Sequence, residues 1–347
     1  MFVECRSDKS RDMQDSVLIT GGAGYIGSHI CKALAKAGYR PITYDNLVHG
    51  HRWAVRWGPL ETGDLLDQAR LGHVFDRYRP LAVVHCAAFA YVGESMINPE
   101  KYYQNNVAGS LSLLQVSRRH LTPIVFSSSC ATYGIPDRLP ITECTQQQPI
   151  NPYGATKLMV ERMITDFGQA YGSPFAILRY FNVGGADADG KIGEDHTPET
   201  HLIPLVIDAA SGRGSPITIF GADYDTPDGT CIRDYVHVSD LADAHVRAVQ
   251  RLLAGGSPDA FNLGIGRGFS VREVVSAVER VAGRMVPVTM SSRRPGDPPA
   301  LVSDATKAHK ELSWKASYDE LDAIIRTAWA WHQTHFSNDE ASPAVVA

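Results

Sequence analysis

The stretch VLITGGAGYIG, residues 17–27, determines the fold expected for this 347-residue chain. Its first four residues are apolar or β-branched and predict a buried strand. Glycines follow at positions 21, 24 and 27, and apolar residues then recur at helical spacing until Gly38. A glycine-rich turn between a strand and a helix lets the backbone and the helix N-terminus approach a pyrophosphate group. The stretch therefore predicts the phosphate-binding turn of a dinucleotide site.

An acidic residue ends the next predicted strand. Asp45 closes the strand 41–45 and follows Gly27 by 18 residues. A carboxylate near that offset accepts hydrogen bonds from the ribose hydroxyls and repels a 2′-phosphate, so it favours NAD over NADP. Asp64 follows in the sequence TGDL, where an ordinary turn carboxylate and a contact to the adenine both stay open.

Further apolar strands alternate with helical patterns at residues 81–85, 124–127 and 175–180. Continuous apolar strands separated by helices predict an α/β fold with a doubly wound, Rossmann-type parallel sheet. After Asn182, glycine, aspartate and proline become frequent. We therefore expect an NAD-binding domain at 17–182 and a smaller α/β substrate domain at 183–335, with loose termini at 1–16 and 337–347. Segment 233–252, which has a strand-like and then a helical pattern, is a candidate to return to the main sheet.

Composition narrows the classes of partner. The net charge is −5 and no stretch concentrates positive charge, so we expect no nucleic-acid partner. No apolar stretch approaches the ~20 residues that cross a bilayer, and the polar start does not resemble a secretory signal. Six scattered cysteines form no C-x-x-C pair, which fits a cytoplasmic protein. His332 and His335 have metal-like spacing but no acidic ligand nearby in the sequence, so we expect no metal site.

A tyrosine and a lysine are spaced for catalysis. Tyr153 and Lys157 lie four residues apart after Pro152, so a helix places both on one face. An ammonium at that distance is expected to lower the pKa of the phenol from its usual ~10, which suits proton transfer near neutral pH. Ser129 ends the strand-like run FSSS and is a third candidate, because ligands of open α/β sheets bind beyond the carboxyl ends of strands.

These residues carry a resemblance. The motifs TGGAGYIGSH, FSSSCATYG, NPYGATK and LRYFNVGG resemble the extended short-chain dehydrogenase/reductase family. Within it, YDNL, VGES, NNVAG, HLIP, RRPGDPPA and the long run TIFGADYDTPDGTCIRDYVHVSDLADAH resemble the UDP-sugar 4-epimerases, from about Val17 to His335.

The resemblance implies a redox-neutral reaction that interconverts UDP-glucose and UDP-galactose. Tyr153 as phenolate takes the proton of the sugar 4-hydroxyl, C4 gives its hydride to NAD, and the 4-keto sugar turns over before hydride returns. Lys157 stabilises the phenolate, and Ser129 assists. The implied NAD contacts, besides Tyr153 and Lys157, are Gly21, Gly24, Tyr25, Ile26, Gly27, Asp45, Asn46, Asp64, Leu65, Ala87, Ala88, Asn106 and Phe181. The implied UDP-sugar contacts, besides Ser129, are Asn182, His201, Leu202, Thr218, Phe220, Arg233, Arg294, Asp297 and Leu301.

Three positions qualify the resemblance. Ala90 stands where some family members carry a lysine, so a cationic contact to the cofactor is missing or comes from another group. His201 stands where others carry asparagine, which makes its role against the diphosphate less defined. Leu301 occupies a position that narrows the sugar pocket when it is bulky, and we expect N-acetylated sugars to be poor substrates.

Several alternatives remain at this point. A nucleotide-sugar 4,6-dehydratase needs an Asp-Glu pair after Ser129, but this chain has Cys130 and Ala131, which excludes that activity. UDP-pentose and UDP-N-acetylhexosamine 4-epimerases share the chemistry at C4 and stay open. A non-catalytic dinucleotide sensor would be expected to lose one of the catalytic residues, and all are present. The resemblance also implies a homodimer, formed through the helices around 106–118 and 153–168.

Overall fold

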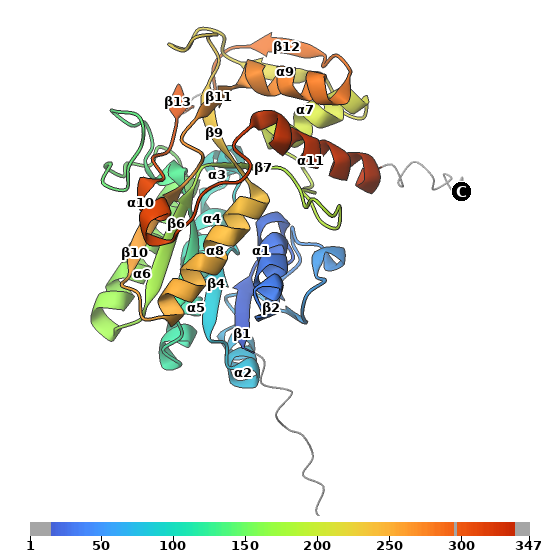
Figure 1. The fold of residues 1–347 in the computed structure, drawn as a ribbon. Coiled ribbons are helices and arrows are strands. Elements are labelled where there is room, and N and C mark those ends of the chain that lie inside the picture. Colours follow the sequence, from blue (N-terminus) through green and yellow to red (C-terminus); the bar gives the residue numbers. More distant parts are fainter. Residues whose placement is uncertain (1–14, 295–296, 337–347) are drawn as a thin grey trace, which may run out of the picture.

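The computed structural model describes residues 15–294 and 297–336. Its main element is a parallel sheet in which the strand order is β10-β6-β5-β4-β1-β2-β3 (Figure 1). This confirms the predicted doubly wound α/β fold. The strands are β1 (Ser16–Thr20), β2 (Arg40–Asp45), β3 (Leu60–Thr62), β4 (Ala82–His85), β5 (Ile124–Ser129), β6 (Phe175–Tyr180) and β10 (Asp259–Leu263).

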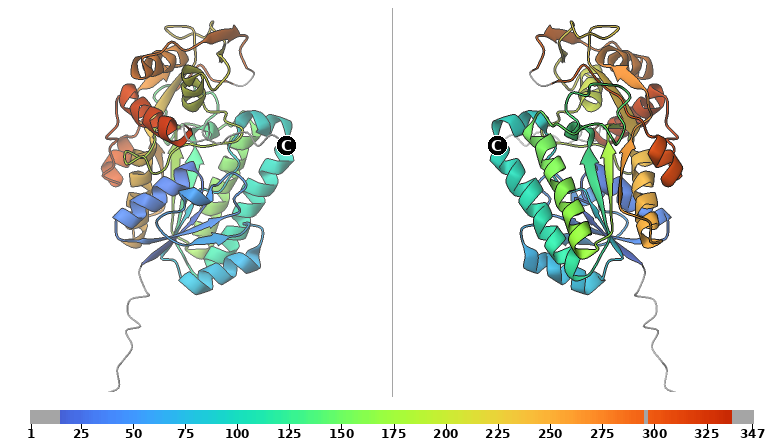
Figure 2. Two further views of the ribbon diagram at one scale, coloured as in Figure 1. Left: turned by 90° about the vertical axis from the view of Figure 1, so that its right-hand side faces the viewer. Right: turned by 90° about the vertical axis from the view of Figure 1, so that its left-hand side faces the viewer.

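Helices cover both faces of this sheet (Figure 2). Helices α1 (Tyr25–Lys36) and α8 (Val238–Leu253) lie on one face, and α10 (Thr306–Glu311) packs beside β10. Helices α2 (Gln68–Tyr78), α5 (Gly109–Arg119) and α6 (Pro152–Tyr171) lie on the other. Val17 and Ile19 of β1 are fully buried beneath α1 and α8, whereas Leu18 packs into the core on the α5 and α6 side. Successive side chains of β1 therefore point to opposite faces of the sheet and contribute to two separate apolar cores.

Short segments connect the larger helices. A 3-10 turn, η2 (Arg52–Ala54), lies between β2 and β3, and another, η4 (Cys130–Thr132), follows β5. Helices α3 (Val92–Ile97) and α4 (Pro99–Tyr102) and the π-helix η3 (Tyr103–Ala108) lead from β4 into α5. No helix within residues 15–294 and 297–336 is long and apolar enough to cross a membrane.

A smaller layer sits beyond the carboxyl ends of the main strands (Figure 1). Strand β9 (Ile232–His237) pairs with β7 (Asn182–Gly184), β11 (Gly268–Ser270) and β13 (Ala300–Leu301), and β8 (Ile217–Phe220) pairs with β12 (Val288–Ser291). Helices α7 (Leu202–Ser211), α9 (Val271–Ala282) and α11 (Leu321–His335) pack with them around a separate apolar core.

The sheet memberships correct three sequence expectations. The main sheet is not confined to 17–182, because β10 joins it beside β6. Segment 233–252 is divided: β9 belongs to the smaller sheet, whereas α8 packs on the main sheet. Ser16 is not part of a loose terminus, since it is buried and begins β1. Residues 1–14 and 337–347, also expected to be loose, lie outside the described residues.

The sheet order places the site. Strands β1 and β4 are neighbours, but the chain leaves them toward opposite edges of the sheet. Their carboxyl ends therefore flank a crevice of the kind in which open α/β sheets bind ligands.

Candidate active site

The glycine turn is built for close approach of a ligand. Gly21 has φ +72°, and a side chain at Gly27 would place its Cβ 2.1 Å from the Gly21 carbonyl oxygen. Gly24 caps α1 with no side-chain hydrogen bond, so the first backbone N–H groups of this helix face the crevice without a competing side chain. A compact turn at a helix N-terminus fits a pyrophosphate, as the sequence predicts.

The predicted ribose and adenine residues lie together beside this turn. The buried Asp45 carboxylate accepts hydrogen bonds from the backbone N–H groups of Ala23, at 3.0 Å, and Leu47, at 2.8 Å. Burial raises the pKa of Asp45, and these two N–H groups oppose that rise. Asn46 donates to the Asp64 carboxylate at 2.9 Å. The backbone N–H groups of the turn can donate hydrogen bonds to phosphate oxygens, and the carboxylates can accept hydrogen bonds from ribose hydroxyls. NAD requires both kinds of group.

The catalytic candidates meet where β5 ends and α6 begins. Asn151 caps α6 by accepting from the Gly154 N–H at 2.8 Å, which sets Tyr153 in the first turn and Lys157 one turn later. The Lys157 ammonium donates to the Ser127 carbonyl oxygen at 2.7 Å. The same ammonium lies 5.9 Å from the centre of the Tyr153 ring.

The pKa expected for Tyr153 is wrong for the protein alone. Burial raises the pKa of Tyr153 to about 12, although a hydrogen bond with Ser129 opposes the rise. Burial also lowers the pKa of Lys157 to about 8. Sequence spacing shows that the two groups share a helix face, but it does not show that both lose their hydration or that the ammonium points to a backbone carbonyl.

The opposite end of the site carries two arginines around one carboxylate. Arg233 donates to the carbonyl oxygens of Ile232 and Pro298 and lies 3.8 Å from Asp297. Arg294 pairs with Asp297 at 3.3 Å, and its guanidinium sits 4.4 Å from the centre of the Phe220 ring. The guanidinium groups of Arg233 and Arg294 are suited to binding the oxygens of a diphosphate, and the aromatic ring of Phe220 is suited to packing against a nucleotide base.

One cavity of about 1200 Å³ joins the two ends. The predicted residues that line it are Gly21, Gly24, Tyr25, Ile26, Gly27, Asp45, Asn46, Asp64, Leu65, Ala87, Ala88, Ser129, Tyr153, Lys157, Phe181, Asn182, His201, Leu202, Thr218, Phe220, Arg233, Arg294, Asp297 and Leu301. Asn106 is absent from this wall. The Asn106 amide accepts a hydrogen bond from the Phe89 N–H at 2.8 Å and donates one to the Phe89 carbonyl oxygen at 3.0 Å. Asn106 therefore stabilises the backbone of Phe89, which lines the cavity.

Sequence reasoning missed several polar residues of the wall. Lys101 lines the cavity near Ala90, pairs with Glu94 at 2.6 Å, and lies 4.2 Å from the centre of the Phe89 ring. Glu194 and His196 line it beside His201. Their spacing with Glu199 and His201, E-x-H-x-x-E-x-H, is a local signal that could have drawn attention to them.

The chain matches the family model described as "NAD dependent epimerase/dehydratase family" over residues 17–264. The chain belongs to this family. A UDP-glucose 4-epimerase of Rhizobium leguminosarum bv. trifolii is 53% identical over 320 residues, which is 92% of this chain and 97% of the relative.

Solved structures of other epimerases extend the match. The UDP-glucose 4-epimerase from Brucella ovis in complex with NAD is 56% identical, with a TM-score of 0.89, and the match covers 91% of this chain and 98% of that one. The UDP-glucose 4-epimerase from Bifidobacterium longum in complex with NAD+ and UDP is 39% identical, with a TM-score of 0.88, covering 93% and 99%. The predicted resemblance is thereby confirmed, and NAD is the cofactor of this family.

Proposed function

We propose that this protein interconverts UDP-glucose and UDP-galactose by epimerising C4 of the hexose, with NAD as its cofactor. The observation that carries the proposal is a shared cavity, because the glycine turn and Asp45 lie in the same wall as Ser129, Tyr153 and Lys157. The UDP-glucose 4-epimerases among the relatives, at about half identity over most of the chain, support the same activity.

The chain's own residues divide the work. Bound NAD supplies a group that accepts hydride from the sugar and returns it. The Tyr153 hydroxyl is the group that takes and returns the proton of the 4-hydroxyl, and Ser129 hydrogen-bonds with it. Lys157 brings a positive charge to the same helix face, which favours the phenolate when the proton leaves. Arg233 and Arg294 hold the diphosphate, so the hexose can present either face while UDP stays in place.

The residues after Ser129 argue against elimination of water. Cys130 and Ala131 line the cavity where a 4,6-dehydratase carries an acidic pair. Burial raises the pKa of the Cys130 thiol to about 12, so it does not ionise near neutral pH. The sugar is therefore oxidised and reduced at C4 without loss of a hydroxyl group.

A substrate panel tests the proposal. Purified protein supplied with NAD is incubated separately with UDP-galactose, UDP-N-acetylgalactosamine and UDP-xylose, and the products are identified by NMR. We expect UDP-glucose to form fastest, from UDP-galactose. Faster epimerisation of the pentose or of the N-acetylated sugar would assign the site to that substrate instead. A lack of turnover with all three would leave the non-catalytic sensor as the better interpretation.

A homodimer is part of the same proposal. Apolar side chains on η3, α5 and α6 are exposed, among them Tyr103, Leu111 and Met159. Helices α5 and α6 pack side by side on one face of the molecule (Figure 2). Exposed apolar side chains on adjacent helices are typical of surfaces that form dimer interfaces. Sedimentation equilibrium measures the assembly state directly.

The cytoplasmic location stays a prediction.

A further inference from the structure

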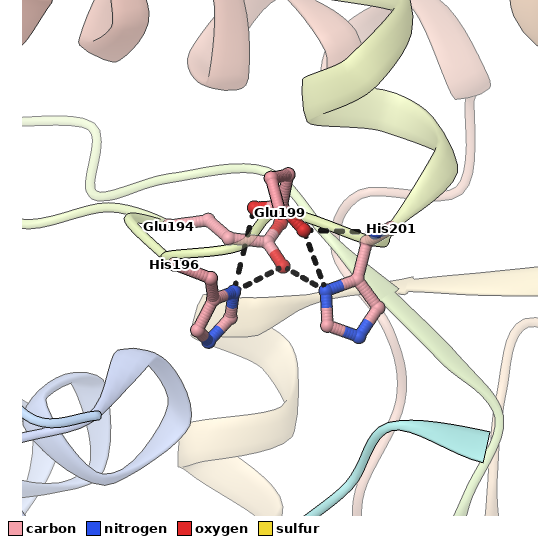
Figure 3. A group of neighbouring side chains, drawn as sticks. All are labelled: Glu194, His196, Glu199 and His201. Atoms are coloured by element: carbon pink, nitrogen blue, oxygen red, sulfur yellow. Dashed lines mark hydrogen bonds and ion pairs between the residues drawn. The ribbon is translucent and has the colours of Figure 1, made fainter. Parts of the chain in front are cut away.

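Four side chains with metal-binding atoms converge in the loop between β7 and α7. Glu194, His196, Glu199 and His201 each contribute one nitrogen or oxygen atom, and all four atoms lie within 4.8 Å of one another. Figure 3 shows both imidazole rings turning Nδ1 toward the same pair of carboxylates.

The separations between the imidazole nitrogens and the carboxylate oxygens are close to those between the ligands of a small metal ion. His201 Nδ1 lies 2.9 Å from a Glu194 oxygen and 3.1 Å from a Glu199 oxygen. His196 Nδ1 lies 3.4 Å from an oxygen of each glutamate. Four ligands bonded to a zinc ion at 2.0–2.1 Å stand about 3.3 Å apart at tetrahedral angles. The nitrogen–oxygen separations lie on both sides of this value, so small movements of these side chains would bring one atom of each residue to bonding distance from a single ion.

Hydrogen bonding within the protein leaves this arrangement incompletely explained. His196 Nδ1 is buried and has no hydrogen-bond partner in the described part of the chain. Its distance of 3.4 Å from both carboxylates is long for an N–H donor. Glu199 is held in place, because one of its oxygens accepts from the backbone N–H groups of Thr200 and His201 at 2.7 and 2.8 Å. His196 Nδ1 is thus a buried nitrogen that faces two carboxylates at ion-pair distance, and a cation between the three groups would bond to all of them.

We propose that these four residues form a binding site for a divalent transition-metal ion, with Zn²⁺ as the ion that fits best. Zn²⁺ takes imidazole nitrogen and carboxylate oxygen in tetrahedral sites, whereas Mg²⁺ favours six oxygen ligands. Two carboxylates neutralise the ion, and both imidazoles then bind through the Nδ1 lone pair. The ion joins the loop to the start of α7 in the cavity wall, and His201 is shared between this metal site and the implied UDP-sugar contacts.

Metal content of the NAD-loaded protein provides the test. Protein stripped with EDTA is dialysed against ZnCl₂, then against metal-free buffer, and zinc is measured by mass spectrometry. We expect roughly one zinc ion per chain and a higher melting temperature than in the stripped protein. His196→Gln and Glu194→Gln should each lose the zinc and the thermal shift. His335→Gln is the matched control, because His335 pairs with the neighbouring Asp195 at 3.0 Å but lies outside the cluster.

Two results would overturn the site. The first is wild-type protein that retains no zinc and melts at the same temperature with or without it. The second is zinc retained equally by His196→Gln, which would mean binding elsewhere on the surface. Co²⁺ binding by the wild type gives a check that needs no variant. Intense visible absorption is expected from tetrahedral Co²⁺ in this cluster, and the weak absorption of an octahedral ion would contradict the proposal.

Discussion

The ammonium of Lys157 hydrogen-bonds to the carbonyl oxygen of Ser127 at 2.7 Å and lies 5.9 Å from the centre of the Tyr153 ring. The end of β5 thus fixes the cation, while the start of α6 fixes the phenol. The buried phenol keeps its proton in the protein alone, since its pKa is raised to about 12. Deprotonation therefore requires nearby positive charge, which Lys157 supplies on the same helix face.

Removing the Tyr153 hydroxyl should stop the reaction but leave the binding site intact. Tyr153→Phe keeps the ring and deletes the group that carries the proton. General acid–base groups contribute about 10²- to 10⁴-fold, so we expect kcat for UDP-galactose to fall by that factor. The NAD content of the purified variant should equal that of the wild type. A variant with near-normal kcat would show that another group is the base.

Changing Asp45 should affect the cofactor rather than the chemistry. Asp45→Ala removes the acceptor beside the glycine turn, so less NAD should remain after gel filtration, and activity should return at high NAD concentration. Asp45→Asn keeps an oxygen that can accept from one of the two backbone N–H groups, and it serves as the matched control for local structure. Full NAD retention by Asp45→Ala would show that the ribose is held by other residues.

The turn and the strand ends could be predicted because each is encoded locally. The sequence from Val17 to Gly27 contains the strand, the glycines and the helix start, and β6 has the bounds expected from its apolar run. Strand β10 could not be placed, since its partner β6 lies far away in the chain. Pairing between distant segments is a tertiary event that no local pattern records.

In the candidate site, too, local motifs could be predicted, whereas properties that depend on the folded structure could not. Nearly all the residues predicted from motif resemblance line the cavity, including Arg233 and Arg294 from separate segments, but many other lining residues, among them Lys101 and His196, were not predicted. Asn106 stays a prediction: its amide hydrogen-bonds to the Phe89 backbone, a side-chain direction that a motif does not record. The direction of the Tyr153 pKa shift also escaped prediction, since burial is a property of the folded whole.

The width of the sugar pocket should depend on Leu301. This side chain is buried with Phe181 and Cys130, and it also lines the cavity. A clash in a close-packed site costs about 1–3 kcal/mol, or about ten- to two-hundred-fold in kcat/KM. We expect kcat/KM for UDP-N-acetylgalactosamine to fall below that for UDP-galactose by this factor, and Leu301→Ser to narrow the gap. Leu301→Tyr should widen it. Equal values in the wild type would refute the steric role.

Acid should destabilise the fold through buried histidines such as His245. Its imidazole shares hydrogen bonds with the Ser127 hydroxyl and the Leu241 carbonyl, and burial lowers its pKa from 6.5 to about 4. The unfolded chain therefore binds the proton first as pH falls, and stability is lost between about pH 6.5 and 4. His245→Gln should lower the pH slope of the unfolding free energy by about 1.4 kcal/mol per pH unit in that window.

Denaturant titrations at several pH values measure this slope. His73→Gln, at an exposed position, is the control for replacing a histidine by glutamine. A slope in His245→Gln equal to that of the wild type would show that His245 is not protonated differently in the two states.

The fate of a deuterium label at C4 tests the proposed reaction most directly. Protein supplied with NAD is given UDP-galactose deuterated at C4, and the product is examined by NMR and mass spectrometry. We expect UDP-glucose that retains the deuterium at C4, because hydride leaves and returns within the closed site while Tyr153 moves the hydroxyl proton. Loss of the label to water, or no conversion of UDP-galactose, would contradict epimerisation by oxidation and reduction at C4.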